Sequence, residues 1–292
     1  MDLGKLGVWL FTDGLSAPDV AALATRIEAH GYSALWLPEA VGREPFAHAS
    51  WLLASTQRLI VATGIASIYA RDASATAQGQ LTLAEQSGGR FLLGLGVSHR
   101  PMVEGIRGHA YGRPLASMRA YLEAMEKAIY VAVRPEEQPP TVIAALGPKM
   151  LALAAEKTRG AHPYLVPPEH TARAREILGP EPWLCTEQKV LLQTDPSTAR
   201  EVARKALAVY LSLPNYRRNL LWLGFSEDDL DGGGSDRIID ALVAWGDEKQ
   251  IADRVQAHFD AGASHVCIQP LHPEGQPRPD ERILEALAPQ GH

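Results

Sequence analysis

The chain has 292 residues, of which 46% are hydrophobic and 21% charged, with a formal net charge of -6. This composition is typical of a globular protein with a large buried core, and the acidic balance argues against a nucleic-acid partner or a membrane surface. That balance favours a small-molecule substrate. The two cysteines, Cys185 and Cys267, lie far apart and indicate neither a disulfide framework nor a metal site, so we expect a cytoplasmic protein.

Short apolar runs recur along the whole chain with helical patterns between them. Because a parallel sheet is covered on both faces, its strands are apolar throughout rather than alternating. The predicted strands span residues 7–11, 34–38, 59–67, 91–97, 141–145, 161–166, 190–193 and 265–269. The repeated strand-helix alternation predicts an α/β protein in which residues 1–292 form a single (β/α)8 TIM barrel.

The helix starts carry recognisable capping residues. Ser16 precedes an apolar helical series and has Asp19 three positions later. Asp195 is followed by a proline at the first helical position. Asp247 and Gln250 form a capping-box pattern at the start of the last long helix. We therefore expect helices to begin at these three places.

Two segments interrupt the alternation. Residues 106–114, after the fourth strand, read as a glycine-rich loop, and residues 214–236, after the seventh, include the turn sequence "DDLDGGGSD". Insertions that follow barrel strands lie at the carboxyl-terminal face, where active sites of this architecture are found. We expect these two segments to select the substrate.

Glycines mark three candidate sites on the chain. Gly64 interrupts the third strand, "LIVATGIASIYAR", which indicates either a bulge or the close approach of a ligand. The stretch "SGGRFLLGLGVSHRP" lacks the third glycine of a dinucleotide-binding turn. The sequence "AALGPKM" begins a helix, which predicts either a phosphate site at Leu146–Lys149 or an ordinary Gly-Pro helix start with a solvated Lys149.

Taken in order, several stretches resemble the luciferase-like monooxygenase superfamily, in particular its branch of F420-dependent oxidoreductases. They are "ALWLPE", "ATGIASIYAR", "SGGRFLLGLGV", "AALGPKMLALAAEKTRGAHPYL", "YLSLPNYRRNLLWLGF" and "AGASHVCIQPL". The resemblance implies a TIM-type barrel that holds a flavin or deazaflavin at the carboxyl ends of its strands. Relatives are often homodimers, and the small-residue helices at 47–56 and 74–87 are candidate surfaces for a homodimer here.

The resemblance also implies where a cofactor binds. A non-prolyl cis peptide bond at Gly64-Ile65 would support the cofactor ring from behind, and Gly94 and Gly96 would let the cofactor tail approach the fourth strand. The backbone of Val97 and Ser98 would face the ribityl-phosphate arm. The remaining cofactor residues that it implies are Ser67, Ala145, Leu146, Gly147 and Pro148.

The acid-base candidates lie at strand exits: Glu39, Arg71, His99 and His162. Relatives place a histidine or an acidic residue after the second strand and an acidic residue after the fourth. Here Glu39 follows the second strand and His99 follows the fourth. Histidine is suited to proton transfer near neutral pH, so His99 and Glu39 are the predicted catalytic residues, with a structural role for His99 as the alternative.

Three functions remain open at this point. The first is an F420-dependent oxidoreductase that passes a hydride between C5 of the deazaflavin and a small organic substrate. The second is an FMN-dependent monooxygenase of the luciferase type, in which reduced flavin meets oxygen. The third is a non-catalytic flavin-binding barrel. The fold is common to all three, so only the site can separate them.

Overall fold

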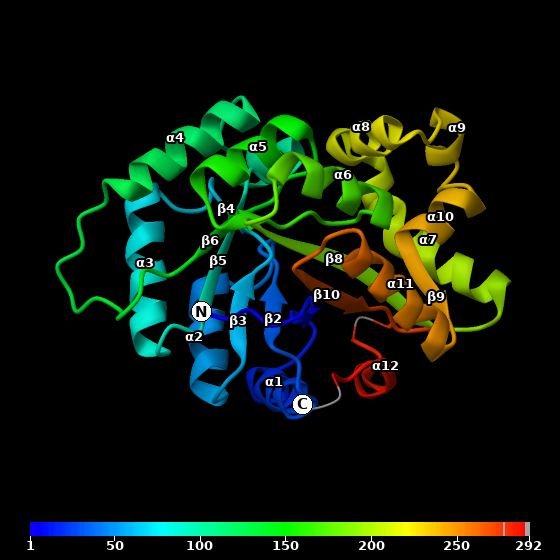
Figure 1. Cartoon of the computed structure of the whole chain (residues 1–292), viewed down its shortest axis with the longest axis horizontal. Helices are drawn as coiled ribbons and strands as arrows, with labels where there is room; N and C mark the ends of the chain where they lie inside the picture. The colour runs from blue at the N-terminus through cyan, green and yellow to red at the C-terminus, as the bar shows by residue number, and fades with distance from the viewer. Residues whose placement is uncertain (277, 290–292) are drawn as a thin grey trace.

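The computed structural model describes residues 1–276 and 278–289, and the expected domain boundary at residue 292 lies outside them. A closed ring of parallel strands occupies the centre of the molecule (Figure 1). Its members are β1 (Leu6–Trp9), β2 (Ala34–Leu37), β3 (Ile60–Thr63), β5 (Phe91–Gly96), β6 (Thr141–Ile143), β7 (Gly160–Ala161), β8 (Trp183–Leu192) and β10 (His265–Pro270). The ring closes because β10 pairs with β1 on one side and with β8 on the other. The predicted (β/α)8 barrel is confirmed.

Helices follow the strands and cover the outside of the ring (Figure 1). They are α1 (Ala17–Ala29), α2 (Pro45–Ser55), α3 (Ala73–Gln86), α4 (Pro114–Glu126), α5 (Pro148–Lys157), α6 (Pro168–Leu178), α7 (Pro196–Ser212), α8 (Pro214–Leu223), α9 (Glu227–Leu230), α10 (Asp236–Leu242), α11 (Glu248–Asp260) and α12 (Glu281–Ala286). Ser16, Asp195 and Asp247 cap α1, α7 and α11 through their side-chain oxygens, as predicted. No described helix is both long and apolar enough to cross a bilayer.

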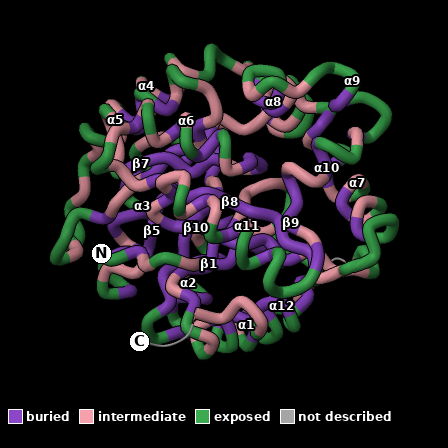
Figure 2. The backbone as a smooth tube through the Cα atoms, turned by 45° about the vertical axis from the view of Figure 1, so that its right-hand side comes forward, coloured by how far each residue is buried: buried purple, intermediate pink, exposed green. Residues whose placement is uncertain are grey.

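Two apolar layers hold the barrel together. The outer layer lies between the strands and the helices and includes Leu35, Phe91 and Leu93. The inner layer fills the ring with Trp9 and Trp36, among others. Successive strand residues alternate between these layers, because side chains of a strand point to opposite faces of the sheet. Figure 2 shows the buried backbone running through the strands, with exposed backbone in the outer loops.

The seventh ring strand is much longer than the sequence predicts. Residues 190–193 were expected, whereas β8 covers Trp183–Leu192. The apolar run is interrupted by Glu187 and Lys189, which are nevertheless buried, because each finds a partner inside the barrel. The outer end of β8 also pairs with β9 (Val243–Gly246), a strand that the sequence did not predict.

The insertions are more helical than expected. The residues at 214–236 form α8 and α9 before a turn in which Gly232, Gly233 and Gly234 have positive φ angles. Together with α7 and α10 they bury a second apolar cluster that includes Leu207 and Ile239. After β5, a π-helix (η1, Pro101–Ile106) precedes the predicted loop. The sixth strand was expected at 161–166, but pairing stops at Ala161 and the chain continues as a buried loop.

The third strand is divided in two. A cis peptide bond joins Gly64 and Ile65 between β3 and the short strand β4 (Ala66–Ser67), as the resemblance implied. Gly94 and Gly96 have a packing role that the sequence analysis did not predict, because this segment occupies the space beside them; the approach of a cofactor tail to them stays a prediction. A Cβ atom on Gly94 would overlap the Thr63 carbonyl oxygen, and one on Gly96 would overlap the Ile65 side chain. These glycines therefore permit close strand packing.

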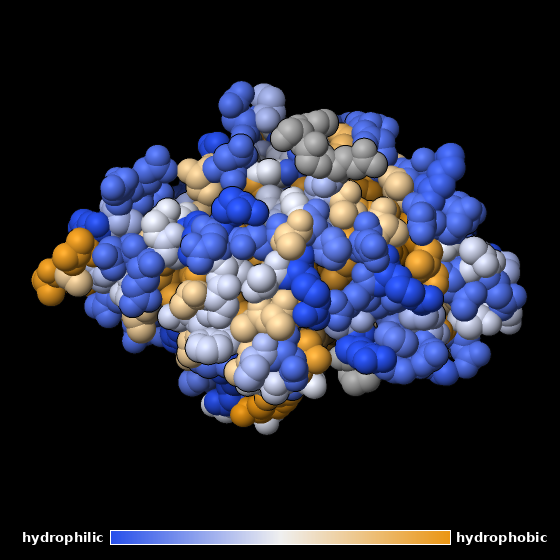
Figure 3. Space-filling model, turned by 90° about the horizontal axis from the view of Figure 1, so that it is seen from below, coloured by the Kyte–Doolittle hydropathy of each residue, from blue (hydrophilic) through white to orange (hydrophobic). Residues whose placement is uncertain are grey.

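The surface is mainly hydrophilic with scattered apolar groups, as Figure 3 shows from below. A hydrophobic projection stands at the left end of this view. Figure 1 places the loop between α4 and β6 at this end, and the loop exposes Ile129, Val131 and Val133. The predicted homodimer through α2 and α3 stays a prediction.

Candidate functional site

The expected cofactor residues come together at the carboxyl ends of three neighbouring strands. Gly64 and Ile65 follow β3, Val97 and Ser98 follow β5, and Ala145 to Pro148 follow β6; in the ring, β5 lies between β3 and β6. Ser67 of β4 pairs with Gly96 at the end of β5. Parallel strands present their carboxyl ends on one face of the barrel, so these segments share that face.

Gly64 is held by aromatic side chains from the barrel interior. The Trp9 indole Nε1 donates a hydrogen bond of 2.9 Å to the Gly64 carbonyl oxygen. A Cβ atom on Gly64 would lie 2.6 Å from Trp9 Nε1 and 3.1 Å from His162 Nε2. No side chain fits there, so glycine is required by packing.

His162 forms part of the support beneath Gly64. Its ring stacks on Trp36 with centroids 4.4 Å apart, and Nδ1 lies 2.7 Å from the Cys185 carbonyl oxygen. Because a carbonyl only accepts, Nδ1 carries the hydrogen and the buried Nε2 is a bare acceptor without a partner among the described residues. Burial lowers the pKa of His162 to about 4, so the ring is neutral at pH 7. His162 therefore supports the site but cannot supply a proton near neutral pH.

The segment after β5 turns sharply. Ser98 has a positive φ of 54°, and its carbonyl oxygen accepts a hydrogen bond of 3.2 Å from the Tyr111 hydroxyl. The next carbonyl, of His99, accepts from the backbone amides of Met102 and Val103 at 3.0 Å, which starts η1. The left-handed residue thus turns the chain directly after the strand.

The segment after β6 leads into an uncapped helix. Gly147 is the N-cap of α5, no side chain caps it, and a Cβ atom there would meet nothing within 4 Å. His170 Nε2 lies 2.8 Å from the Leu146 carbonyl oxygen and fixes this loop to α6. Burial lowers the pKa of His170 to about 4, so it donates from a neutral ring. The free backbone amides and the helix dipole make this end of α5 suitable for an anion.

Glu39 is surrounded by hydrogen-bond donors. Its carboxylate accepts from the Ser67 amide at 2.8 Å, from both terminal nitrogens of Arg71 at 3.0 Å and from Arg107 at 3.2 Å. Only 6% of its side chain is exposed. Every donor faces a carboxylate oxygen, so Glu39 fixes β4 to the end of η1.

His99 lies half-buried between two segments of the carboxyl face. Its ring centroid is 5.7 Å from that of Tyr216 on α8. Burial lowers the pKa of His99, and the Asn215 side chain opposes that shift in part. His99 is therefore mainly neutral at pH 7, which allows it to accept a proton.

A polar network inside the barrel was missed by the sequence analysis. Its members are Tyr164, Glu187, Lys189, Tyr210 and Gln269. In the strand register Cys267 pairs with Glu187 and Gln269 with Lys189, so these side chains point into the same lumen. The signal was available as the period-two spacing of Cys185, Glu187 and Lys189, but it became interpretable only once their strand was known to be buried.

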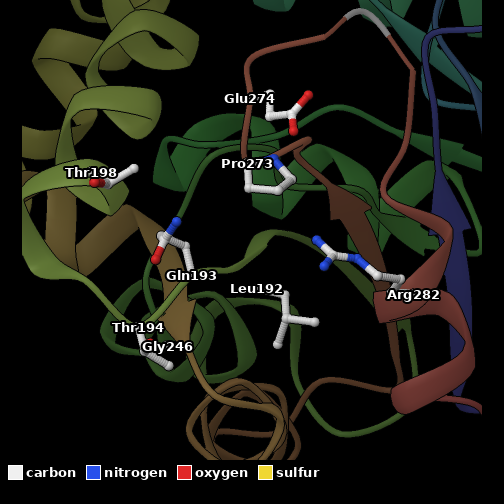
Figure 4. Close-up of a pocket in the computed structure, with 8 residues that line it drawn as sticks. All are labelled: Leu192, Gln193, Thr194, Thr198, Gly246, Pro273, Glu274 and Arg282. Atoms are coloured by element: carbon white, nitrogen blue, oxygen red, sulfur yellow. The ribbon is translucent and has the colours of Figure 1, made fainter.

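Two hollows in the surface lie away from these residues. Figure 4 shows the first, of about 530 Å³, beside the outer ends of β8 and β9. Two of its polar residues do not suit an anion: Arg282 is held by Asp280, and Glu274 would repel one. The second, of about 690 Å³, opens at the amino ends of β6 and β8, where Thr141 and Trp183 line it. Barrel active sites lie at the carboxyl ends of the strands, so the second hollow is not the expected site. The first hollow lies beyond the carboxyl ends of β8 and β9, away from the segments that follow β3, β5 and β6.

Comparison with known proteins adds the following. The sequence pattern of the family described as luciferase-like monooxygenase matches residues 1–265. Over 172 residues the chain is 36% identical to a Mycobacterium tuberculosis protein named "Putative coenzyme F420-dependent oxidoreductase". That match covers 58% of this chain and 47% of the relative, so the chain spans about half the length of the relative.

Solved structures share the fold at low identity. The F420-dependent tetrahydromethanopterin reductase from Methanopyrus kandleri has a TM-score of 0.73 at 17% identity, over 97% of each chain. An F420-dependent secondary alcohol dehydrogenase, solved with an F420-acetone adduct, has a TM-score of 0.78 at 14% identity, over 97% of each chain. The FMN-bound oxygenating constituent of 3,6-diketocamphane monooxygenase from Pseudomonas putida has a TM-score of 0.70 at 15% identity, over 97% of this chain and 96% of that one.

Proposed function

The chain belongs to the family of luciferase-like monooxygenases, and we propose that it is an F420-dependent oxidoreductase that passes a hydride between C5 of the deazaflavin and a small organic substrate. The relative from Mycobacterium tuberculosis supports F420 as the cofactor, since its name carries that cofactor. FMN is the alternative cofactor, since a structural neighbour was solved with FMN. The substrate is proposed only as a class.

The observation that carries the proposal is the arrangement at the ends of β3, β5 and β6. Gly64 is fixed by Trp9 and carries no side chain. Ser98 turns its backbone at the adjoining strand end. Gly147 leaves open space over the uncapped start of α5. A planar ring with a phosphate-bearing tail fits this set, with the ring at Gly64-Ile65 and the phosphate at Leu146–Pro148.

The chain's own side chains supply the acid-base step. The cofactor, when bound, takes up or releases a hydride at C5. Where the substrate is an alcohol, the neutral imidazole of His99 takes the hydroxyl proton as the C–H hydride leaves, and the substrate becomes a carbonyl compound. In the reverse direction His99 returns the proton to the oxygen. Glu39 acts by positioning Ser67, Arg71 and Arg107 around the site.

The test is a fluorescence titration of the purified protein with coenzyme F420 and, in the same buffer, with FMN. We expect tighter binding of F420, followed by reduction or oxidation of the bound deazaflavin with small alcohols or carbonyl compounds. Preference for FMN, with oxygen consumption by the reduced complex, would move the assignment to the monooxygenase alternative. Binding of neither cofactor would refute both enzymatic proposals.

A further inference from the structure

The buried network around Lys189 satisfies almost all of its own polar atoms. The Lys189 ammonium lies 3.2 Å from Glu187 Oε1, 3.0 Å from Gln269 Oε1 and 3.9 Å from the centre of the Tyr164 ring. The second carboxylate oxygen of Glu187 accepts from the Leu165 amide at 2.9 Å. Only 1% of the Lys189 side chain is exposed. Three N–H groups thus meet two oxygens and an aromatic face, which is a complete set for a buried ammonium.

Lys189 also determines which way the Gln269 amide is turned. An ammonium donates and cannot accept, so the Gln269 atom that faces it is the carbonyl oxygen. The same oxygen lies 2.9 Å from the Tyr164 hydroxyl, which therefore directs its hydrogen to Gln269. Tyr210, whose hydroxyl lies 2.9 Å from that of Tyr164, supplies the other hydrogen. Lys189 and Tyr164 thus both donate to the Gln269 carbonyl oxygen, so the Gln269 amide nitrogen points away from them.

The Gln269 amide nitrogen is the open end of this network. It makes no hydrogen bond within residues 1–276 and 278–289. Unlike the buried polar atoms that lack a partner, it is not fully enclosed by the protein. Gln269 as a whole is only 7% exposed. It comes next to last in β10, near the carboxyl end of that strand. The network therefore presents two oriented N–H donors at this end of the barrel.

This open end adjoins the support for the proposed cofactor ring. The Tyr164 ring lies 5.0 Å from that of Trp9, and Trp9 holds the Gly64 carbonyl. An oriented amide beside a buried cation is complementary to a carbonyl-type oxygen that gains negative charge. Flavins and deazaflavins carry such oxygens on the pyrimidine edge of the ring, and that edge becomes anionic on reduction.

We propose that the Gln269 side-chain amide binds a carbonyl oxygen on the pyrimidine edge of the cofactor, and that Lys189 and Tyr164 are positioning residues that fix its orientation. The proposal rests on the proposed function, because it requires a flavin or deazaflavin in this barrel. It assigns Gln269 a preference for the reduced ring, which carries more charge on that edge. F420 and FMN share the pyrimidine edge, so the assignment holds for either cofactor.

The test compares dissociation constants of oxidised and reduced F420 for the wild type and for Gln269→Glu. The glutamate keeps an oxygen for Lys189 and Tyr164 but replaces the amide donors with a second acceptor. We expect binding of oxidised F420 to weaken at least tenfold and binding of reduced F420 to weaken further, so that the reduction potential of the bound cofactor falls. Gln193→Glu is the matched control, because Gln193 follows β8 outside the ring and lines the hollow in Figure 4.

Gln269→Met provides a second variant without added charge, in case the extra carboxylate beside Glu187 prevents folding. It removes the donors as well, and the same preferential loss of reduced F420 is expected. Equal affinities in wild type and variants, or an equal loss for both redox states, would overturn the assignment. If wild-type protein binds FMN instead of F420, the same ratios are measured with FMN, since failure of the cofactor choice leaves the edge contact testable. Wild-type protein that binds neither would overturn both proposals.

Discussion

Replacement of Gly147 by aspartate separates the stability of α5 from its proposed role in binding phosphate. Gly147 is the N-cap of α5 with φ -87° and ψ 159°, which is extended backbone that aspartate adopts, and an added Cβ meets nothing within 4 Å. Aspartate is a better N-cap than glycine by a few tenths of a kcal/mol, and its charge adds about 0.3–1 kcal/mol at a helix amino end. The variant is therefore expected to be more stable than wild type, by roughly 0.5–1 kcal/mol.

Cofactor binding is expected to change in the opposite direction. The new carboxylate takes the amide hydrogens that the phosphate would use and repels the phosphate charge. Two like charges about 4 Å apart repel by about 1 kcal/mol in water and about 4 kcal/mol at the protein-like effective dielectric constant of 20. Binding of F420 should thus weaken by roughly fivefold or more. Because the repulsion is electrostatic, the loss should shrink in concentrated salt.

The assay combines urea unfolding with a fluorescence titration of F420 at low and high salt. Gly147→Asn is the matched control, since asparagine caps helices as well as aspartate does but brings no charge. We expect both variants to be stabilised, and the aspartate variant to bind F420 more weakly than the asparagine variant, because both side chains take the amide hydrogens but only aspartate repels the phosphate. Equal F420 affinities in the two variants would refute a phosphate at the start of α5.

Three other predictions concern the barrel core and the buried histidines. Gly94→Ala should lower the free energy of urea unfolding by roughly 3 kcal/mol or more, because the added Cβ overlaps the Thr63 carbonyl. Gly105→Ala is the control, since a Cβ atom there lies in open space. Equal stabilities of the two variants would contradict this packing. The pKa of His99, followed by NMR titration, should lie below 6.5 and fall further in Asn215→Ala, which removes the side chain that raises it; no change would exclude that influence. Buried neutral histidines with pKa values of about 3 to 4 bind fewer protons in the folded protein than in the unfolded chain. Their contribution to the free energy of unfolding should therefore be complete above pH 6.5. It should be lost as the pH falls toward 4, by about 1.4 kcal/mol per pH unit for each histidine. The histidines concerned are His162, His170, His258 and His265. Equal unfolding free energies at pH 7.5 and pH 5.5 would rule out this contribution.

Local sequence signals were sufficient for the elements and their order. Helix starts at Ser16, Asp195 and Asp247 depend on a side-chain oxygen and a backbone amide three residues away, so the pattern contains both partners. Uninterrupted apolar runs likewise predicted most ring strands, because burial on both faces excludes polar residues. The order of strands and helices then favoured a barrel, and Gly64 marked the break in the third strand.

Contacts between distant segments decided the rest. Glu187 and Lys189 precede the predicted seventh strand, 190–193, yet they lie within β8 because each supplies the other's countercharge inside the lumen. Their remaining partners, Tyr164 and Gln269, come from after β7 and from β10. No local pattern contains such a pairing, since burial of a charge is tolerated only where tertiary structure brings a partner to it.

The same reason governs the predicted site residues. Glu39 matched a proton donor by its place after the second strand, but its surroundings are set by Arg71 and Arg107, which lie far along the chain. Gly94 suggested the approach of a cofactor, and the structure adds that the absence of a Cβ atom there makes room for the Thr63 carbonyl of the neighbouring strand. The sequence alone therefore determined which strand ends carry the candidate site, and the tertiary structure decided what each side chain there can do, because hydrogen-bond partners and free space depend on residues brought together only by folding.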